Sequence, residues 1–329
     1  MKTNSFLHKN VVYEPGQKKN WTGRKTAPNL SNQYWYQDIQ CLNLNNIQDS
    51  ITPNFGLVGY ACDEGVKRNF GRVGAKYGPQ SIRDALAKLP LHFKDKIVAD
   101  YGDIICIEDD MKACQSSFSN SISALITQSV FPIGLGGGHD IAYAHYKGLK
   151  KNLKEKRIGI INFDAHFDLR PVETKPNSGT PFNQIITELK NEKQTLDYFV
   201  IGVQQQSNTR ALFEIASKEN VEFVFSDACD IAFEAIENIK QKLNPILEAN
   251  DYLYITIDMD GFSSAYAKGV SAPSPLGFSP QFFFKILNHV LKTNKVIACD
   301  IAELNPEKDE DGQTANLAAK IIDYIIRSL

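Results

Sequence analysis

The sequence predicts an α/β fold in which a parallel sheet is covered by helices on both faces. Apolar, strand-like segments alternate with helix-like segments over most of the 329 residues. Strands that alternate with helices are joined by right-handed crossovers, which build a parallel sheet. No Pro/Ser-rich linker or change in composition divides the chain. We therefore predict a single domain over residues 1–329, with residues 1–50 as an N-terminal extension that wraps the surface and docks through its aromatic side chains.

The predicted elements follow in order along the chain. Pro79 lies near the start of the first long helix, where its missing N–H costs little. The expected strands are apolar runs that cover residues 55–60, 97–104, 131–135, 158–163, 198–203, 221–225, 252–257 and 296–301. The expected helices lie between and after them, at residues 78–86, 111–129, 140–154, 207–219, 230–247, 279–293 and 316–328.

Composition excludes several classes of function. The chain has 36 Lys and Arg against 38 Asp and Glu, a formal charge of −2, so it lacks the basic excess expected for nucleic acid or an anionic membrane. No apolar run approaches the roughly 20 residues of a membrane span, and the N-terminus lacks the apolar core of a secretory signal. The cysteines are scattered without a CxxC pair, which predicts reduced thiols in a cytoplasmic protein; they are Cys41, Cys62, Cys106, Cys114, Cys229 and Cys299.

The strand at 158–163 ends in three potential metal ligands, Asp164, His166 and Asp168. In extended backbone alternate residues point to the same side, so side chains at this spacing can converge on one point. Two carboxylates around one imidazole suit a divalent cation that accepts oxygen and nitrogen together, such as manganese. Taken alone, the same three residues are equally compatible with a loop of solvated carboxylates.

Neighbouring strand ends supply more ligands of the same kind. His139 follows three glycines, Asp258 and Asp260 follow the strand at 252–257, and Glu303 follows the strand at 296–301. In open α/β sheets, sites form at the carboxyl ends of the strands. A cluster of four carboxylates would repel itself unless cations neutralised it. Six ligands are too many for one ion with room for substrate, so we predict two ions that share carboxylates.

These motifs resemble the ureohydrolase (arginase/agmatinase) family. The matching segments are GGGHD at 136–140, DAHFD at 164–168, SGTPF at 178–182, DMDG at 258–261 and DIAELNP at 300–306. The resemblance implies a three-layer α/β/α sandwich around an eight-stranded parallel sheet, assembled as trimers or hexamers. It also implies two Mn²⁺ ions, although Co or Zn would accept the same donors. The implied ligands are His139, Asp164, Asp168 and Asp258 for the first ion, and Asp164, His166, Asp258 and Asp260 for the second.

Within the family, the chain is most similar to the formimidoylglutamase branch. The segments that carry this similarity are WTGR at 21–24, residues 61–86, residues 207–213 and GVSAP at 269–273. Phe182 stands where arginases have a proton-shuttling histidine, and Arg170 stands where they have an asparagine that helps to bind the α-carboxylate.

The predicted reaction is hydrolysis of a C–N bond in an amidine, with N-formimidoyl-L-glutamate giving L-glutamate and formamide. Asp168 is expected to transfer the proton to the leaving amine, and Glu303 to pair with the amidinium. Substrate carboxylates would be bound by Arg170 and Arg210, with hydroxyl groups from Ser178 and Thr180. Arg72 is expected to hold the glycine-rich loop in place.

Three alternatives remain open at this stage. One is a ureohydrolase acting on another guanidino substrate, such as agmatine or guanidinobutyrate, although agmatine has no carboxylate for an arginine to bind. Another is a single-zinc deacetylase, which would need a catalytic histidine pair where the glycine stretch offers only His139. The third is a non-catalytic protein that keeps the fold, which predicts eroded ligands.

Overall fold

The computed structural model describes residues 7–27, 32–47 and 51–329. Parts of the predicted N-terminal extension, residues 1–6, 28–31 and 48–50, lie outside the described residues. Over the described ranges, no helix is long and apolar enough to cross a membrane.

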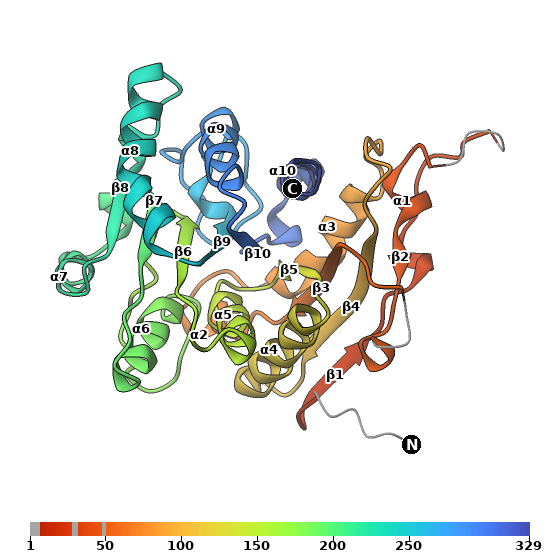
Figure 1. Cartoon of the computed structure of the whole chain (residues 1–329), viewed down its shortest axis with the longest axis horizontal. Helices are drawn as coiled ribbons and strands as arrows, with labels where there is room; N and C mark the ends of the chain where they lie inside the picture. The colour runs from red at the N-terminus through yellow and green to blue at the C-terminus, as the bar shows by residue number, and fades with distance from the viewer. Residues whose placement is uncertain (1–6, 28–31, 48–50) are drawn as a thin grey trace.

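A central sheet of parallel strands runs through the molecule (Figure 1). In the described part of the chain the sheet has 10 strands. Its parallel part, written in spatial order, is β4 (Val98–Cys106), β3 (Phe55–Ala61), β5 (Phe131–Gly136), β10 (Val296–Ala302), β9 (Tyr252–Asp258), β6 (Ile158–Phe163), β7 (Tyr198–Val203) and β8 (Glu222–Phe225). This arrangement confirms the predicted α/β class.

Two short strands from the N-terminal segment extend the sheet beyond β4. The strand β1 (Val11–Glu14) pairs antiparallel with β4, and β2 (Gln40–Cys41) pairs with β4 in parallel. Neither strand is predicted from the sequence, because each is short and flanked by polar residues.

Helices cover both faces of the sheet, which gives three layers (Figure 1). Residues of one hydrophobic cluster come from the helices on the first face, which are α3 (Gly78–Leu86), α8 (Phe233–Ala249), α9 (Pro280–Leu291) and α10 (Gln313–Ser328). A second cluster takes its residues from the helices on the other face, which are α4 (Met111–Thr127), α5 (Ile141–Asn152), α6 (Pro181–Asn191) and α7 (Arg210–Lys218). The remaining short helices are α1 (Trp35–Asp38) and α2 (Glu64–Arg68).

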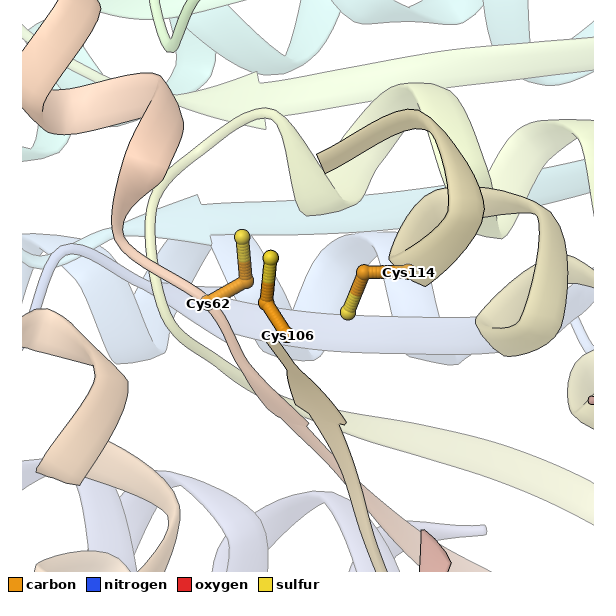
Figure 2. Close-up of side chains that lie close together, drawn as sticks. All are labelled: Cys62, Cys106 and Cys114. Carbon is orange, nitrogen blue, oxygen red and sulfur yellow. The ribbon is translucent and has the colours of Figure 1, made fainter. Parts of the chain in front are cut away.

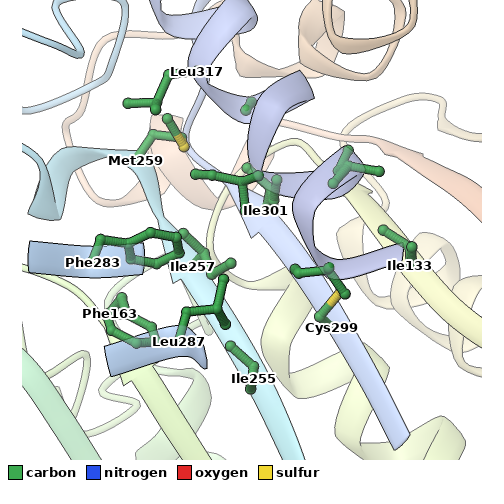
Figure 3. Close-up of a cluster of buried hydrophobic side chains, with 14 of the residues drawn as sticks. Ile133, Phe163, Ile255, Ile257, Met259, Phe283, Leu287, Cys299, Ile301 and Leu317 are labelled. Carbon is green, nitrogen blue, oxygen red and sulfur yellow. The ribbon is translucent and has the colours of Figure 1, made fainter. Parts of the chain in front are cut away.

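The strands alternate their side chains between these two layers. In β6, Ile161 belongs to the first cluster and Ile160 to the second. Figure 3 shows the first cluster, in which Ile257 and Phe163 pack against Phe283 of α9. Because both faces are covered, the strands are apolar along their whole length, as expected for a parallel sheet.

The N-terminal segment is attached through two buried tryptophans. The indole N–H of Trp21 donates to Asp100 Oδ2 at 2.8 Å, and that of Trp35 donates to Asp323 Oδ1 at 2.9 Å. Asp100 also forms a buried ion pair with Arg83 of α3, at 2.9 Å. The indole groups therefore satisfy carboxylates that would otherwise be buried with fewer partners.

The carboxyl ends of the strands carry the loops that matter most for function. The strands β5, β10, β9 and β6 are consecutive in the sheet, so the loops that follow them meet at one edge. On the same edge, the ends of β3 and β4 lie close to the first turn of α4 (Figure 2).

Candidate metal centre

His139, Asp164, Asp168 and Asp258 form the first of two ligand clusters, and their donor atoms lie within 4.8 Å of one another. His139 Nδ1 lies 2.9 Å from Oδ2 of Asp168 and 3.1 Å from Oδ2 of Asp164. The same nitrogen lies 3.2 Å from Oδ2 of Asp258. These are the four residues that the resemblance assigns to the first ion.

The second cluster consists of Asp164, His166 and Asp260. His166 Nδ1 lies 3.2 Å from Asp260 Oδ2 and 3.4 Å from Asp164 Oδ1. Asp164 therefore presents one carboxylate oxygen to each cluster, as a shared ligand would. Asp258 falls in the first cluster only, and its Oδ1 accepts the backbone N–H of Asp260 at 2.8 Å. Its sharing between two ions stays a prediction.

The hydrogen bonds of His139 show that its inward nitrogen is suited to a cation. Thr256 donates its hydroxyl proton to Asp300 Oδ1 at 2.6 Å, so its oxygen is free to accept the Nε2–H of His139 at 3.0 Å. In the neutral ring the proton on Nε2 leaves a lone pair on Nδ1. That lone pair faces three carboxylates, an arrangement that is repulsive without a positive charge between them. The donor set therefore fits a divalent cation.

The pKa values of residues in this cluster show the same excess of negative charge. Burial lowers the pKa of His139, but the hydrogen bonds that its ring donates to the carboxylates of Asp164 and Asp168 outweigh this effect and raise the pKa well above the ordinary value. Burial and the neighbouring charge of Asp260 raise the pKa of Asp258 well above its usual range. Buried carboxylates thus attract positive charge, from a proton or from a metal ion.

Several side chains that the sequence analysis does not single out hold this loop in place. Asn162 donates to Asp164 Oδ2 at 3.0 Å and to the hydroxyl of Tyr198 at 2.9 Å. Asn208 accepts the backbone N–H of Phe167 at 3.0 Å and donates to the carbonyl of Ala165 at 2.9 Å. Such outer contacts fix the orientation of ligands. No local motif marks Asn208, because its partners lie 41 and 43 residues away, and the contact of Asn162 with Tyr198 spans 36 residues.

Two of the predicted functional residues have left-handed backbone conformations. Asp168 has a φ of 48° and Glu303 a φ of 65°. Side chains other than glycine rarely adopt this region, and the cost of about 1–3 kcal/mol is tolerated mainly at functional sites. In both cases the turn directs a carboxylate into the same cavity.

A cavity of about 280 Å³ opens onto the two ligand clusters, and its lining includes His166, Asp168, Asp258 and Asp260. Glu303 also lines it and is only 4 % exposed. Its Oε1 accepts the backbone N–H of His139 at 2.8 Å, whereas its Oε2 is buried without a hydrogen-bond partner. Burial raises the pKa of Glu303 to about 8. An acceptor left unsatisfied beside a cavity is available to a cationic ligand.

Of the residues predicted to bind substrate carboxylates, the structure brings two to the cavity and leaves two away from it. Arg170 and Ser178 line the cavity. Thr180 is fully buried, and its hydroxyl is used locally, donating to the carbonyl of Asn177 at 2.9 Å. The side chain of Arg210 is 93 % exposed and pairs with Glu214 one turn along α7. The helix begins at Arg210 and turns this side chain outward, so it does not reach the cavity.

Two further expectations concern Arg72 and Phe182. Arg72 donates to the carbonyl oxygens of Ser271 and Val270, which ties the glycine-rich loop to residues 269–273, and the residue also lines the cavity. Phe182 is fully buried, with its ring edge-on to His139 and stacked on Tyr198 at 4.2 Å. It packs beneath the ligands and contributes no group that could move a proton.

Comparisons with known proteins agree with this geometry. A formimidoylglutamase from Clostridium tetani (strain Massachusetts / E88) is 39% identical over 331 residues, covering 97% of this chain and 97% of its own. One from Streptococcus gordonii is 40% identical over 307 residues, covering 92% of this chain and 93% of its own.

Solved structures share the fold at lower sequence identity. The crystal structure of formimidoylglutamase from Bacillus subtilis has a TM-score of 0.75 at 23% identity, over 85% of this chain and 87% of its own. That of Trypanosoma cruzi formiminoglutamase with Mn²⁺ also has a TM-score of 0.75, at 22% identity, over 87% and 98% of the two chains. The model of the arginase family matches residues 53–327, which include all six predicted ligands. This chain belongs to the arginase family and is a hydrolase.

Proposed function

We propose that this protein is a binuclear metal hydrolase that converts N-formimidoyl-L-glutamate and water to L-glutamate and formamide. The observation that carries the proposal is the cavity in which two carboxylate–imidazole clusters, the unsatisfied oxygen of Glu303 and the guanidinium of Arg170 occur together. The curated relatives named above support the choice of substrate.

The first cation would be held by His139, Asp164, Asp168 and Asp258, and the second by Asp164, His166 and Asp260 with Asp258 beside them. We propose Mn²⁺ for both, because the donors are hard oxygens and imidazole nitrogens. Bound divalent cations lower the pKa of water and so make a nucleophile available at neutral pH. Outer hydrogen bonds from Thr256 and Asn162 would keep the ligands oriented before metal binds.

The remaining groups have distinct tasks around the substrate. Asp168 lies at the boundary between ligands and cavity, and its carboxylate would carry a proton to the departing amine nitrogen. The Oε2 of Glu303 would accept hydrogen bonds from the amidinium and hold its plane in place. Arg170 would bind a carboxylate of the glutamate part, and Ser178 would add a hydroxyl donor.

A substrate panel tests this assignment. The purified protein, supplied with Mn²⁺, is offered N-formimidoyl-L-glutamate, agmatine, guanidinobutyrate and arginine, and formamide, glutamate and urea are measured. We expect formamide and glutamate from the first compound and no urea from the others. Urea from a guanidino substrate, with no formamide from formimidoylglutamate, would replace the proposal by the ureohydrolase alternative.

We further propose that the enzyme serves histidine degradation in the cytoplasm and assembles as a trimer or hexamer. Membership of the arginase family supports this proposal. Light scattering on the purified protein measures the mass of the assembly, and a monomer at micromolar concentration would contradict the oligomer.

A further inference from the structure

Three cysteine side chains, outside the carboxylate–imidazole clusters, meet at the end of the sheet (Figure 2). Cys62 follows β3, Cys106 is the last residue of β4, and Cys114 lies in the first turn of α4. Their Sγ atoms all lie within 4.8 Å of one another. The sequence gives no sign of this cluster, because the three residues do not form a short-spaced motif.

The sheet register explains why they meet. In the parallel pair β3 and β4, Ala61 lies opposite Ile105, so the next residues on the two strands, Cys62 and Cys106, are side by side. The helix α4 packs across this corner and places the thiol of Cys114 3.8 Å from the carbonyl oxygen of Ile104. Figure 2 shows the sulfurs of Cys62 and Cys106 close together and pointing the same way, whereas the side chain of Cys114 comes from the helix with its sulfur pointing the opposite way.

The separation of the sulfurs suits a shared ion. With a Zn–S bond of about 2.3 Å, sulfurs around a tetrahedral ion lie roughly 3.8 Å apart, and around a trigonal ion roughly 4.0 Å apart. The sulfurs of the three cysteines lie within 4.8 Å of one another, so any two of them must approach each other by at most about 1 Å to bind one ion. Rotation of the Cys114 side chain about its Cα–Cβ bond can supply such a movement.

The surroundings favour a cation at this position. Hydrogen bonds from Cys114 and Cys62 lower the pKa of Cys106, which favours the thiolate form of this residue. Asp110 adds negative charge nearby. Cys62 and Cys114 are buried, whereas Cys106 is partly exposed and offers a route of entry. A positive ion would offset this concentration of negative charge.

We propose that Cys62, Cys106 and Cys114 form a three-thiolate site for a soft d¹⁰ cation, Zn²⁺ or Cu⁺, in addition to the carboxylate–imidazole centre. Thiolates select such ions, whereas the hard donors of the other centre suit Mn²⁺. Binding displaces the thiol protons of Cys62 and Cys114 to solvent, and three sulfur–metal bonds form without any change of oxidation state.

An ion at this site would fasten β3, β4 and α4 together. The cysteine site is connected to the carboxylate–imidazole centre by a backbone hydrogen bond. The carbonyl of Cys62 accepts the N–H of Gly138, the neighbour of His139, at 3.0 Å. A Cβ on Gly137 would lie 2.0 Å from that carbonyl oxygen, so the two segments are in close contact. The expected consequence of binding is greater thermal stability.

Co²⁺ provides a direct test, because thiolate ligands give cobalt an intense charge-transfer absorption that oxygen and nitrogen ligands do not. The full-length protein is reduced, loaded with Mn²⁺ and titrated with Co²⁺, and then with Zn²⁺ or with Cu⁺ in the presence of a chromophoric chelator. We expect the band to appear at one ion per chain and to disappear when Zn²⁺ or Cu⁺ displaces cobalt. The two competitors, compared in parallel, identify which ion binds more tightly.

Cys106→Ser is the informative variant, and Cys41→Ser is its matched control, because Cys41 is a partly buried thiol outside the cluster. We expect Cys106→Ser to lose the band and to bind Zn²⁺ at least about 100-fold more weakly, since loss of even an outer contact costs 10–100-fold. The control should keep the band, and Zn²⁺ should raise the Tm of the wild type but not of Cys106→Ser. If Cys106→Ser does not fold, the same band and Zn²⁺ affinity are measured on Cys114→Ala.

Three outcomes would overturn the proposal: no charge-transfer band in the wild type, a band that persists in both cluster variants, or a Cys62–Cys106 disulfide in protein kept under reducing conditions. Thiol counting before and after addition of Zn²⁺ detects the disulfide.

Discussion

Replacement of Glu303 by glutamine removes one charge and little volume from the wall of the cavity. The variant keeps an oxygen that can accept the N–H of His139, as Oε1 does now. What it loses is the buried, unsatisfied Oε2 that we propose to pair with the cationic amidinium. The change therefore tests the pairing without opening a hole in the structure.

The size of the effect follows from the burial of this group. Glu303 is 4 % exposed, so its partner charge would be bound in a water-poor site. Removing one member of a buried ion pair costs about 3–5 kcal/mol. At 1.36 kcal/mol for each factor of ten, kcat/KM for formimidoylglutamate should fall by roughly 10²–10⁴-fold.

The assay measures formamide release by Glu303→Gln with Mn²⁺ saturating, and the Mn²⁺ content of the variant is measured beside it. Glu307→Gln is the matched control, because Glu307 is exposed on the same loop and does not line the cavity. It should retain the wild-type kcat/KM. Normal activity of Glu303→Gln at normal metal content would refute the assigned pairing, whereas loss of metal would show that the residue acts on His139 instead.

Three other predictions address neighbouring parts of the structure. Thr256→Val removes the acceptor of the His139 Nε2–H, so Mn²⁺ affinity measured by titration should fall about 10–100-fold, and unchanged affinity would contradict the tautomer argument. Arg170→Ala should raise KM for formimidoylglutamate by at least about tenfold with a smaller change in kcat. Arg210 is exposed, so Arg210→Ala should leave both constants unchanged in the same steady-state assay. The reverse result would assign the carboxylate contact to Arg210. Arg83→Met leaves the buried Asp100 without its cation, so the free energy of unfolding from denaturant curves should fall by about 3 kcal/mol, and a change below about 1 kcal/mol would show that the pair is dispensable.

The sequence determined the fold class because the periodicity of its apolar segments is local information. The strands at 158–163 and 198–203 have the predicted bounds, since parallel strands buried on both faces are continuous apolar runs. The helix α6 is absent from the prediction, although Pro181 at its start is an ordinary helix signal.

The six candidate ligands could be found from the sequence because their positions relative to the strands are also local information. Each lies within a few residues of a strand end, and the carboxyl ends of parallel strands meet at one edge of the sheet. Asp164, His166 and Asp168 therefore lie within reach of one another by local spacing, whatever the rest of the chain does. Their grouping with His139 and Asp258 needed only the strand order of the sheet.

Only the tertiary structure decided which side chains face the cavity and which support it. Arg210 and Asn208 are two residues apart, yet one points to solvent and the other is buried beneath the ligand loop, because the start of α7 lies between them. Thr256 gains its role through contacts 44 and 117 residues away in sequence. The cysteine cluster likewise depends on strand register and helix packing. Such contacts are set by the packing of whole elements, which no short stretch of sequence specifies.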